Sequence, residues 1–201
     1  MDVEIRQADS ERDAAGVAEI YGAAVETTIA SFEAVAPDAA EIGERMRRVL
    51  ARTPWLVAID EGRLVGYAYA AIHRERAGYR WSVDVSAYVR DGYRGRRIGR
   101  SLYDWLLPIV RRQGFANAYA GIALPNPASV ALHEAIGMRL IGVYERVGWK
   151  RLGEAPGAWL DVAWYGMRLG EPPLTEAGEP AEPLALAEVM GRPGPPGAAT
   201  P

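Results

Sequence analysis

Hydrophobic and polar positions follow two different periods along the first 170 residues, and the changes of period predict the secondary structure. Apolar side chains that recur every three or four positions predict helices, whereas short alternating or wholly apolar runs bounded by glycine, proline or charge predict strands. The predicted strands span 3–7, 55–59, 64–72, 79–89, 118–124, 138–147 and 158–169. Two predicted helices begin after Ser10 and Asp38, and two more span 98–112 and 128–136.

Residues with special backbone preferences mark several ends of these elements. Ser10 and Asp38 are the expected N-caps of the first two helices. Pro108 lies inside the third helical pattern, where we expect a kink or a local break, and residues 148–157 are expected to join the last two strands. The order of elements predicts an α/β (α+β) layered fold with a mixed sheet.

The composition changes after residue 170. Residues 171–201 hold eight of the 14 prolines, five glutamates against one arginine, and no aromatic residue. Such a segment buries too little apolar surface to order itself. We therefore expect a folded domain over 1–170 and a Pro/Glu-rich C-terminal tail over 171–201, mostly disordered, with a short helix near 184–190.

Charge and rare residues exclude several classes of function. The net charge is −3, and most of the acidic excess lies in the tail, so the domain has no strongly basic balance of the kind that nucleic acid requires. There is no cysteine and there are two histidines, which argues against disulfides and metal sites. The N-terminus lacks the pattern of a secretory signal, and no apolar run is long enough to span a membrane. We expect a cytoplasmic protein with no metal and no nucleic-acid or membrane partner.

A glycine-marked turn after the strand at 79–89 is the strongest local candidate for a ligand site. Five arginines lie between residues 90 and 100, together with Gly95 and Gly99. Backbone N–H groups of such a turn and the positive end of the following helix suit a pyrophosphate. The spacing fits neither a P-loop nor a dinucleotide fingerprint. The alternative is a glycine turn beside a solvated arginine face.

The sequence Arg-Gly-x-x-x-Gly at 94–99, between a strand and an amphipathic helix and followed by a strand that ends near Asn126, resembles the acyl-CoA motif of the GNAT N-acetyltransferases. Further matches resemble the phosphinothricin and methionine sulfoximine N-acetyltransferases of that superfamily. They include 21–32, 55–58, 66–70, 79–81, 121–126, 132–137, 148–150 and 159–162. The resemblance covers about residues 3–169 and implies a GNAT-like mixed, mostly antiparallel sheet with helices on both faces.

The resemblance implies acetyl-CoA as the acyl donor. The resemblance also implies that backbone groups of 87–89 pair with the pantetheine arm, that amides of 94–100 hold the pyrophosphate, and that Asn126 lies near the thioester. The implied cofactor-binding residues are Ala87, Tyr88, Val89, Arg94, Gly95, Arg96, Arg97, Ile98, Gly99, Arg100, Asn126 and Ser129. Arg97 replaces the usual glycine of the family. If that position needs a positive φ, the arginine costs about 1 kcal/mol, and we expect reduced or altered affinity for CoA.

Two residues are candidates for catalysis. Asp84 lies in the middle of a strand where the resembling enzymes carry a glutamate that acts as general base; the shorter side chain favours a bridging water. The alternative for Asp84 is an exposed strand carboxylate. His133 stands where the resembling enzymes place a histidine near the active centre, as a base or proton relay; the alternative is a packed or surface histidine. Met138 replaces the tyrosine that many GNAT enzymes use to protonate the thiolate, which leaves readily without an acid.

The implied acceptor-binding residues are Phe32, Arg74, Arg76 and Tyr79, which supply cations and aromatic walls for a small zwitterion with an acidic side group. For the two arginines, the alternative is a solvated loop. Trp149, Lys150 and Trp159 lie in or beside the closing strands, which in the resembling family help to shape the site across a homodimer; here they are more readily interpreted as core and interface packing. Residues 151–157 look like an insertion.

The prediction is therefore an acetyl-CoA-dependent N-acetyltransferase that acts on the α-amine of a small amino acid analogue of the phosphinothricin or methionine sulfoximine type, by direct transfer in a ternary complex. The partners expected are a small-molecule amine and a second copy of the chain. Two alternatives stay open. One is a non-catalytic acyl-CoA-binding or sensor domain, and the other is an acetyltransferase of a peptide or other amine.

Overall fold

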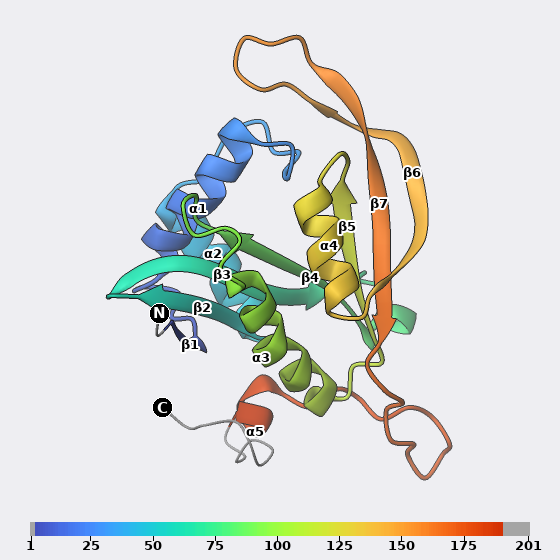
Figure 1. The fold of residues 1–201 in the computed structure, drawn as a ribbon. Coiled ribbons are helices and arrows are strands. Elements are labelled where there is room, and N and C mark those ends of the chain that lie inside the picture. The colour runs from blue at the N-terminus through green and yellow to red at the C-terminus, as the bar shows by residue number, and fades with distance from the viewer. Residues whose placement is uncertain (1–2, 191–201) are drawn as a thin grey trace.

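The computed structural model describes residues 3–190, which form one seven-stranded sheet in the order β1-β2-β3-β4-β5-β7-β6 (Figure 1). The strands are β1 Glu4–Gln7, β2 Trp55–Asp60, β3 Arg63–Ile72, β4 Ser82–Val89, β5 Asn117–Ala123, β6 Arg139–Lys150 and β7 Ala158–Arg168. The helices are α1 Ala14–Thr27, α2 Ala39–Leu50, α3 Ile98–Gln113, α4 Pro127–Ala135 and α5 Leu186–Met190, with a 3₁₀ turn, η1, at Ala77–Tyr79. The element order and the mixed, mostly antiparallel sheet confirm the predicted fold class.

Alternate residues along the central strands pack into two separate cores, one on each face of the sheet. Val57 and Tyr67 join the core under α1 and α2, whereas Leu56 and Ala68 join the core under α3. This division follows from the two-residue repeat of a strand, which sends successive side chains to opposite faces. Helices therefore cover both faces, as the sequence pattern predicted (Figure 1).

The two central strands separate after a short contact. Among the strands of residues 3–190, β4 and β5 are the one parallel pair, and their register covers three positions, from Ser82 opposite Asn117 to Asp84 opposite Tyr119. Beyond that point β4 continues to Val89 beside β3, while β5 continues to Ala123 beside β7. An opening therefore begins at Asp84 and widens toward the N-terminus of α3, and Figure 1 shows the two strands running apart.

Three predicted element boundaries were wrong by three residues, and local or long-range contacts explain each shift. The first helix begins at Ala14 and not after Ser10, because Asp13 turns its carboxylate back to Arg6 and to the Asp9 N–H. β4 begins at Ser82, and the preceding Tyr79 lies in η1, where its N–H donates to the Arg76 carbonyl. β6 runs on to residue 150 because it keeps pairing with β7, which shortens the connecting loop to 151–157.

Two helix signals had different outcomes. Asp38 caps α2 as predicted, since its side chain accepts from the Glu41 N–H at 2.8 Å. Of the kink or local break expected at Pro108, the break was wrong, because α3 continues through it to Gln113; the kink stays a prediction. Pro108 lies on the exposed side of the helix, and the buried neighbours Leu106 and Val110 keep that turn packed on the sheet.

The first part of the C-terminal segment is attached to the domain. The short helix expected near 184–190 is α5, which buries Leu186 and Val189 against α3. Gln113 donates to the Leu184 carbonyl at 3.0 Å, and the Trp81 indole donates to the Ala181 carbonyl at 2.7 Å. The rest of the tail prediction, at 191–201, lies outside the described residues, and the domain boundary at 170 stays a prediction.

Candidate active site

Asp84 lies at the point where β4 and β5 separate, and it is paired with a histidine. The imidazole Nδ1 of His73 lies 2.6 Å from the carboxylate Oδ1 of Asp84. His73 directly follows β3, and its backbone N–H donates to the Ser82 carbonyl, so the β3–β4 register brings the two side chains together. Asp84 keeps 31% of its side-chain surface exposed and His73 keeps 16%.

The surroundings of Asp84 make it a stronger base than an ordinary aspartate. Burial raises its pKa, while the hydrogen bond from His73 and the nearby charge of Arg74 act in the opposite direction without cancelling that increase. A half-buried carboxylate of this kind at an opening suits proton abstraction or the orientation of a neighbouring base.

Aromatic side chains from three other elements surround His73. Its ring centroid lies 4.9 Å from that of Tyr119, 6.0 Å from that of Tyr79 and 6.0 Å from that of Trp164. Tyr144 continues the cluster at 5.9 Å from Trp164. The predicted acceptor residue Tyr79 is therefore next to the Asp84–His73 pair. Sequence reasoning missed His73, because it lies in the charged connection after β3 and no motif marks it.

The other predicted acceptor residues lie around this cluster at greater exposure. Arg74 lies next to the pair and donates from Nη1 to the His73 carbonyl at 3.2 Å. The Arg76 side chain is exposed, one residue before η1. Phe32 lies against β6 at Gly148, where a Cβ would overlap its ring. Arg74 and Tyr79 thus contact the pair itself, whereas Phe32 belongs to a separate wall formed with β6.

Lys150 fastens that wall from within the same chain. Its buried Nζ donates to the carbonyls of Val25 and Glu33 at 2.8 and 2.9 Å, and burial lowers its pKa. These bonds join the end of β6 to the last turn of α1 and to the loop that follows it. Trp149 and Trp159 pair edge to face at 5.5 Å and stay half exposed.

The open edge of β4 presents alternate backbone groups toward β5. The N–H of Arg90 and the carbonyl of Ser82 both bond on the β3 side, so the even-numbered groups of β4 face β3. By the alternation of a strand, the odd-numbered groups of Val85, Ala87 and Val89 face the opening. The backbone groups of Ala87 and Val89 are therefore directed into the opening, whereas those of Tyr88 are directed to β3; their predicted contact with pantetheine stays a prediction.

Two residues of the turn before α3 have a positive φ. Gly95 has φ 77°, and Arg97, the N-cap of α3, has φ 64° and ψ 7°. Position 97 therefore takes a positive φ, the case in which an arginine was expected to cost stability there. Ile98 is buried, and Gly99 allows Leu132 of α4 to approach to 3.0 Å from where a Cβ would stand.

The arginines of this turn divide between structural contacts and exposed positions. Arg100 donates from Nη1 to the Ala135 carbonyl at 2.6 Å and from Nε to Asp104 at 2.8 Å, which ties α3 to the end of α4. Arg94 lies 3.4 Å from Asp91, and the guanidinium of Arg96 lies 4.9 Å from the centroid of the ring of Tyr93.

His133 lies in the last turn of α4, in a closed network of hydrogen bonds. Its Nδ1 lies 2.7 Å from the Ser129 carbonyl, which can only accept, so Nδ1 carries the proton and Nε2 accepts from the Tyr103 hydroxyl at 3.0 Å. His133 is 5% exposed, and burial lowers its pKa. Asn126 caps the first turn of α4 by accepting from the Ser129 N–H at 3.1 Å. His133 and Asp84 have separate sets of partners.

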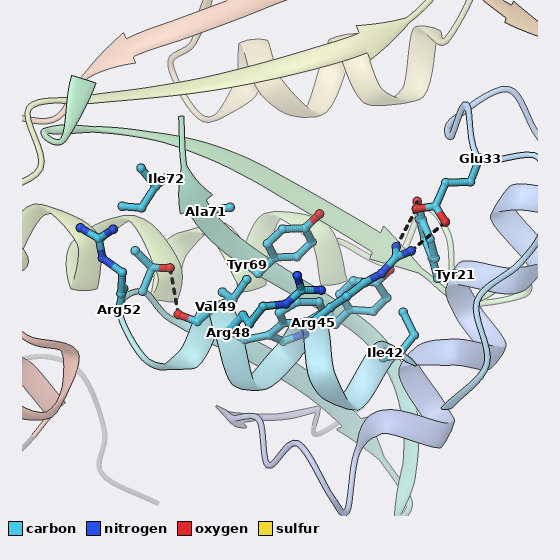
Figure 2. A pocket seen from close by; sticks show the side chains of 13 residues that line it. Tyr21, Glu33, Ile42, Arg45, Arg48, Val49, Arg52, Tyr69, Ala71 and Ile72 are labelled. Atoms are coloured by element: carbon cyan, nitrogen blue, oxygen red, sulfur yellow. Dashed lines mark hydrogen bonds and ion pairs between the residues drawn. The ribbon is translucent and has the colours of Figure 1, made fainter. Parts of the chain in front are cut away.

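A pocket of about 430 Å³ lies between α2 and strands β2 and β3 (Figure 2). Glu33 forms one end of the pocket. Its Oε1 accepts hydrogen bonds from Nη1 of Arg45 at 2.6 Å and from the Tyr21 hydroxyl at 2.7 Å. The other end reaches Ala71 and Ile72, and Ala71 is the register partner of Asp84. The pocket therefore opens on the same face of the sheet as Asp84 and ends close to it.

Other kinds of site receive no support from the described part of the chain. Within residues 3–190, no group of three or more histidine, aspartate or glutamate side chains is placed to hold a metal ion. None of the helices in the same range is long and apolar enough to cross a membrane.

Comparison with known proteins adds independent evidence. Residues 16–138 match the model of the Acetyltransferase (GNAT) family. Phosphinothricin N-acetyltransferase of Streptomyces viridochromogenes is 36% identical over 81% of this chain and 86% of its own length. L-methionine sulfoximine/L-methionine sulfone acetyltransferase of Salmonella typhimurium is 33% identical over 83% of this chain and 95% of its own length.

Among solved structures, the GNAT superfamily phosphinothricin acetyltransferase of Sinorhizobium meliloti, in complex with acetyl-CoA, superposes with a TM-score of 0.80. It is 34% identical and covers 90% of this chain and 95% of its own. An acetyltransferase structure from Salmonella typhimurium with its cofactor acetyl-CoA has a TM-score of 0.79 and 31% identity, over 88% of this chain and 99% of its own.

Proposed function

Because this chain belongs to the GNAT acetyltransferase family, we propose that it moves the acetyl group of acetyl-CoA to the α-amine of a small amino acid analogue of the phosphinothricin or methionine sulfoximine type. Transfer is direct, within a ternary complex of protein, donor and acceptor. The observation that carries the proposal is the position of Asp84, a proton-accepting side chain at the point where the opening between β4 and β5 begins. The names of the relatives support this class of acceptor.

The donor is assigned to that opening and to the helix N-terminus behind it. Backbone groups of Ala87 and Val89 bind the pantetheine arm, and the turn from Arg94 to Arg100 binds the pyrophosphate. Asn126 and Ser129 lie at the start of α4, where they face the thioester end of the arm. His133 bonds to Ser129, and through it supports this turn; its predicted role as base or relay stays untested.

The acceptor is assigned to the face that carries His73 and Asp84. Tyr79 and Phe32 provide aromatic walls, and Arg74 and Arg76 attract the acidic side group of the acceptor. Asp84, alone or through its partner, removes the proton of the acceptor ammonium. An amine must be neutral before it can attack the thioester carbonyl, which makes this step a condition of the reaction.

A homodimer is also proposed, through β6. This strand lies at the edge of the sheet and exposes large apolar side chains along its length. They include Leu140, Ile141, Val143, Tyr144, Val147 and Trp149. An exposed apolar edge strand is a liability unless a partner covers it. A cytoplasmic location is proposed because acetyl-CoA is made and used inside the cell.

The test is the release of free thiol from acetyl-CoA in the presence of phosphinothricin, methionine sulfoximine, common L-amino acids, a short peptide and a polyamine. We expect release with the first two and acetylation at the α-amine by mass spectrometry. Arg63→Gln, a substitution at an exposed position at the start of β3, serves as a control with unchanged rate. Tight CoA binding by calorimetry without turnover on any amine would overturn the proposal in favour of a sensor.

A further inference from the structure

The proposed function does not decide whether Asp84 or its partner His73 takes the proton of the acceptor. Its Nδ1 faces Asp84 at 2.6 Å. An ionised carboxylate has no proton to donate, so Nδ1 carries the proton and the second ring nitrogen, Nε2, holds a lone pair. No residue in the described range 3–190 hydrogen-bonds to Nε2. The pair therefore presents an unoccupied proton acceptor on the side of the ring away from Asp84.

The position of the ring is suited to an ammonium group. Tyr79, Tyr119 and Trp164 surround His73 from three elements, with centroids within 6.0 Å. Aromatic faces attract a cation without neutralising it. Asp84 lies inside β4 with its Oδ1 already engaged by the imidazole, whereas Nε2 of that ring has no partner within the described residues.

We propose that His73 is the general base of the reaction, with Asp84 as the residue that orients and charges it. This rests on the proposed function. The acceptor ammonium gives one proton to Nε2 of His73, and the neutral amine attacks the thioester carbonyl to form the C–N bond. The C–S bond then breaks, the second nitrogen proton goes to the departing sulfur to give CoA as a thiol, and the imidazolium returns its proton to solvent.

The charges around the ring are consistent with this assignment. Asp84 faces it from β4, Arg74 from the β3–β4 connection, Tyr79 from η1 and Tyr119 from β5. The carboxylate is the one formal negative charge in contact with the ring, and it stabilises the imidazolium that forms during proton transfer. A neutral or apolar group at position 84 would leave that imidazolium without a partner.

The test replaces His73 by asparagine. The asparagine amide can donate to Asp84 as Nδ1 does, but it cannot accept a proton. We expect His73→Asn to lose about 10²- to 10⁴-fold in kcat/KM for the acceptor at neutral pH, which is the usual contribution of a general base. Glu75→Gln, two residues along the same exposed connection, is the matched control with little change in rate. Affinity for CoA, measured by calorimetry, should be the same in all three proteins.

A pH series separates a lost base from a lost position. As the pH approaches the pKa of the acceptor amine, the amine loses its proton to water, and the rate of His73→Asn should recover toward wild type. A merely structural role predicts a loss that does not depend on pH. Either that result or a near-normal rate of His73→Asn at neutral pH would overturn the proposal. His73→Gln is the second variant if the first fails to fold. An inactive wild type would instead sink the proposed function.

Discussion

The two histidines of this chain lie in opposite kinds of surroundings. His73 is partly open, has one ring nitrogen on a carboxylate, and is surrounded by aromatic rings on the proposed acceptor side of the sheet. His133 is closed, with a carbonyl at one nitrogen and a tyrosine hydroxyl at the other, on the proposed cofactor side. A histidine can act as a base when one ring nitrogen is left for the substrate. When both ring nitrogens are hydrogen-bonded within the protein, its role is structural.

The difference shows that hydrogen-bond partners decide the role of a residue more than its identity does. His133 lies on a helix beside the predicted cofactor contacts, and its local sequence matches a family motif. His73 lies in a connection with no motif around it. The geometry nevertheless places a carboxylate, that of Asp84, beside one nitrogen of His73. His133 instead receives a second hydrogen bond, from the hydroxyl of Tyr103.

The largest expected effect lies at the open site. Asp84→Asn should lower kcat/KM for the acceptor by about 10²- to 10⁴-fold, because the amide cannot stabilise an imidazolium at position 73. Combining it with His73→Asn should cost little more than either change alone, since the two residues act as a unit. Thiol release measures the rates.

If the loss of kcat/KM in the double variant equals the product of the two single losses, Asp84 and His73 contribute separately. The description of His73 as a base that depends on Asp84 would then be wrong. Calorimetry with CoA is the control, because neither side chain is assigned to the cofactor.

At the closed site, Tyr103→Phe should act on stability. The change leaves Nε2 of His133 buried without a donor, which costs about 1–3 kcal/mol in the free energy of unfolding. Urea denaturation measures this loss of stability. Tyr93→Phe is the control, because the Tyr93 hydroxyl makes no hydrogen bond to a helix within residues 3–190. A large loss of kcat/KM for the acceptor in Tyr103→Phe, with stability unchanged, would show that this network serves catalysis after all.

The pH dependence of stability should also report the closed histidine. Burial holds the folded-state pKa of His133 below its ordinary value near 6.5. As the pH falls below about 6.5, the unfolded chain takes up the proton first, so the free energy of unfolding decreases. The contribution of one such group is at most about 1.4 kcal/mol per pH unit. The wild type should therefore lose more stability than His133→Gln between pH 7.5 and 5.5, and equal losses would contradict a buried neutral imidazole.

The smallest effect concerns Arg97, in the turn before α3. Arg97 occupies φ 64°, so Arg97→Gly should raise the free energy of unfolding by about 0.5–1 kcal/mol. Arg97→Ala keeps the backbone strain and removes the charge, so it should not gain stability. A weaker affinity for acetyl-CoA in both variants would assign a phosphate contact to the guanidinium. A loss of stability in Arg97→Gly would show that the side chain holds the turn.

Much of the cofactor side could be predicted, because its signals are local. Gly95 and Gly99, the arginines between them and the capping Asn126 follow one another within short stretches of chain, and the structure places them at the starts of α3 and α4. The strained backbone of Arg97 could be anticipated for the same reason. The acceptor side was predicted less well. His73 and Asp84 are eleven positions apart, and the β3–β4 register alone makes them neighbours.

The sequence by itself determined the order of strands and helices, the phosphate-type turn, the carboxylate in the middle of β4 and the family resemblance. These properties depend on periodicity, on glycine and on motifs that neighbouring residues carry together. The tertiary structure alone decided which histidine is open and which is closed, and that Lys150 fastens the end of β6 to the loop after α1 within one chain. Such choices depend on which distant groups meet and which are shielded from water, and no spacing along the chain determines that.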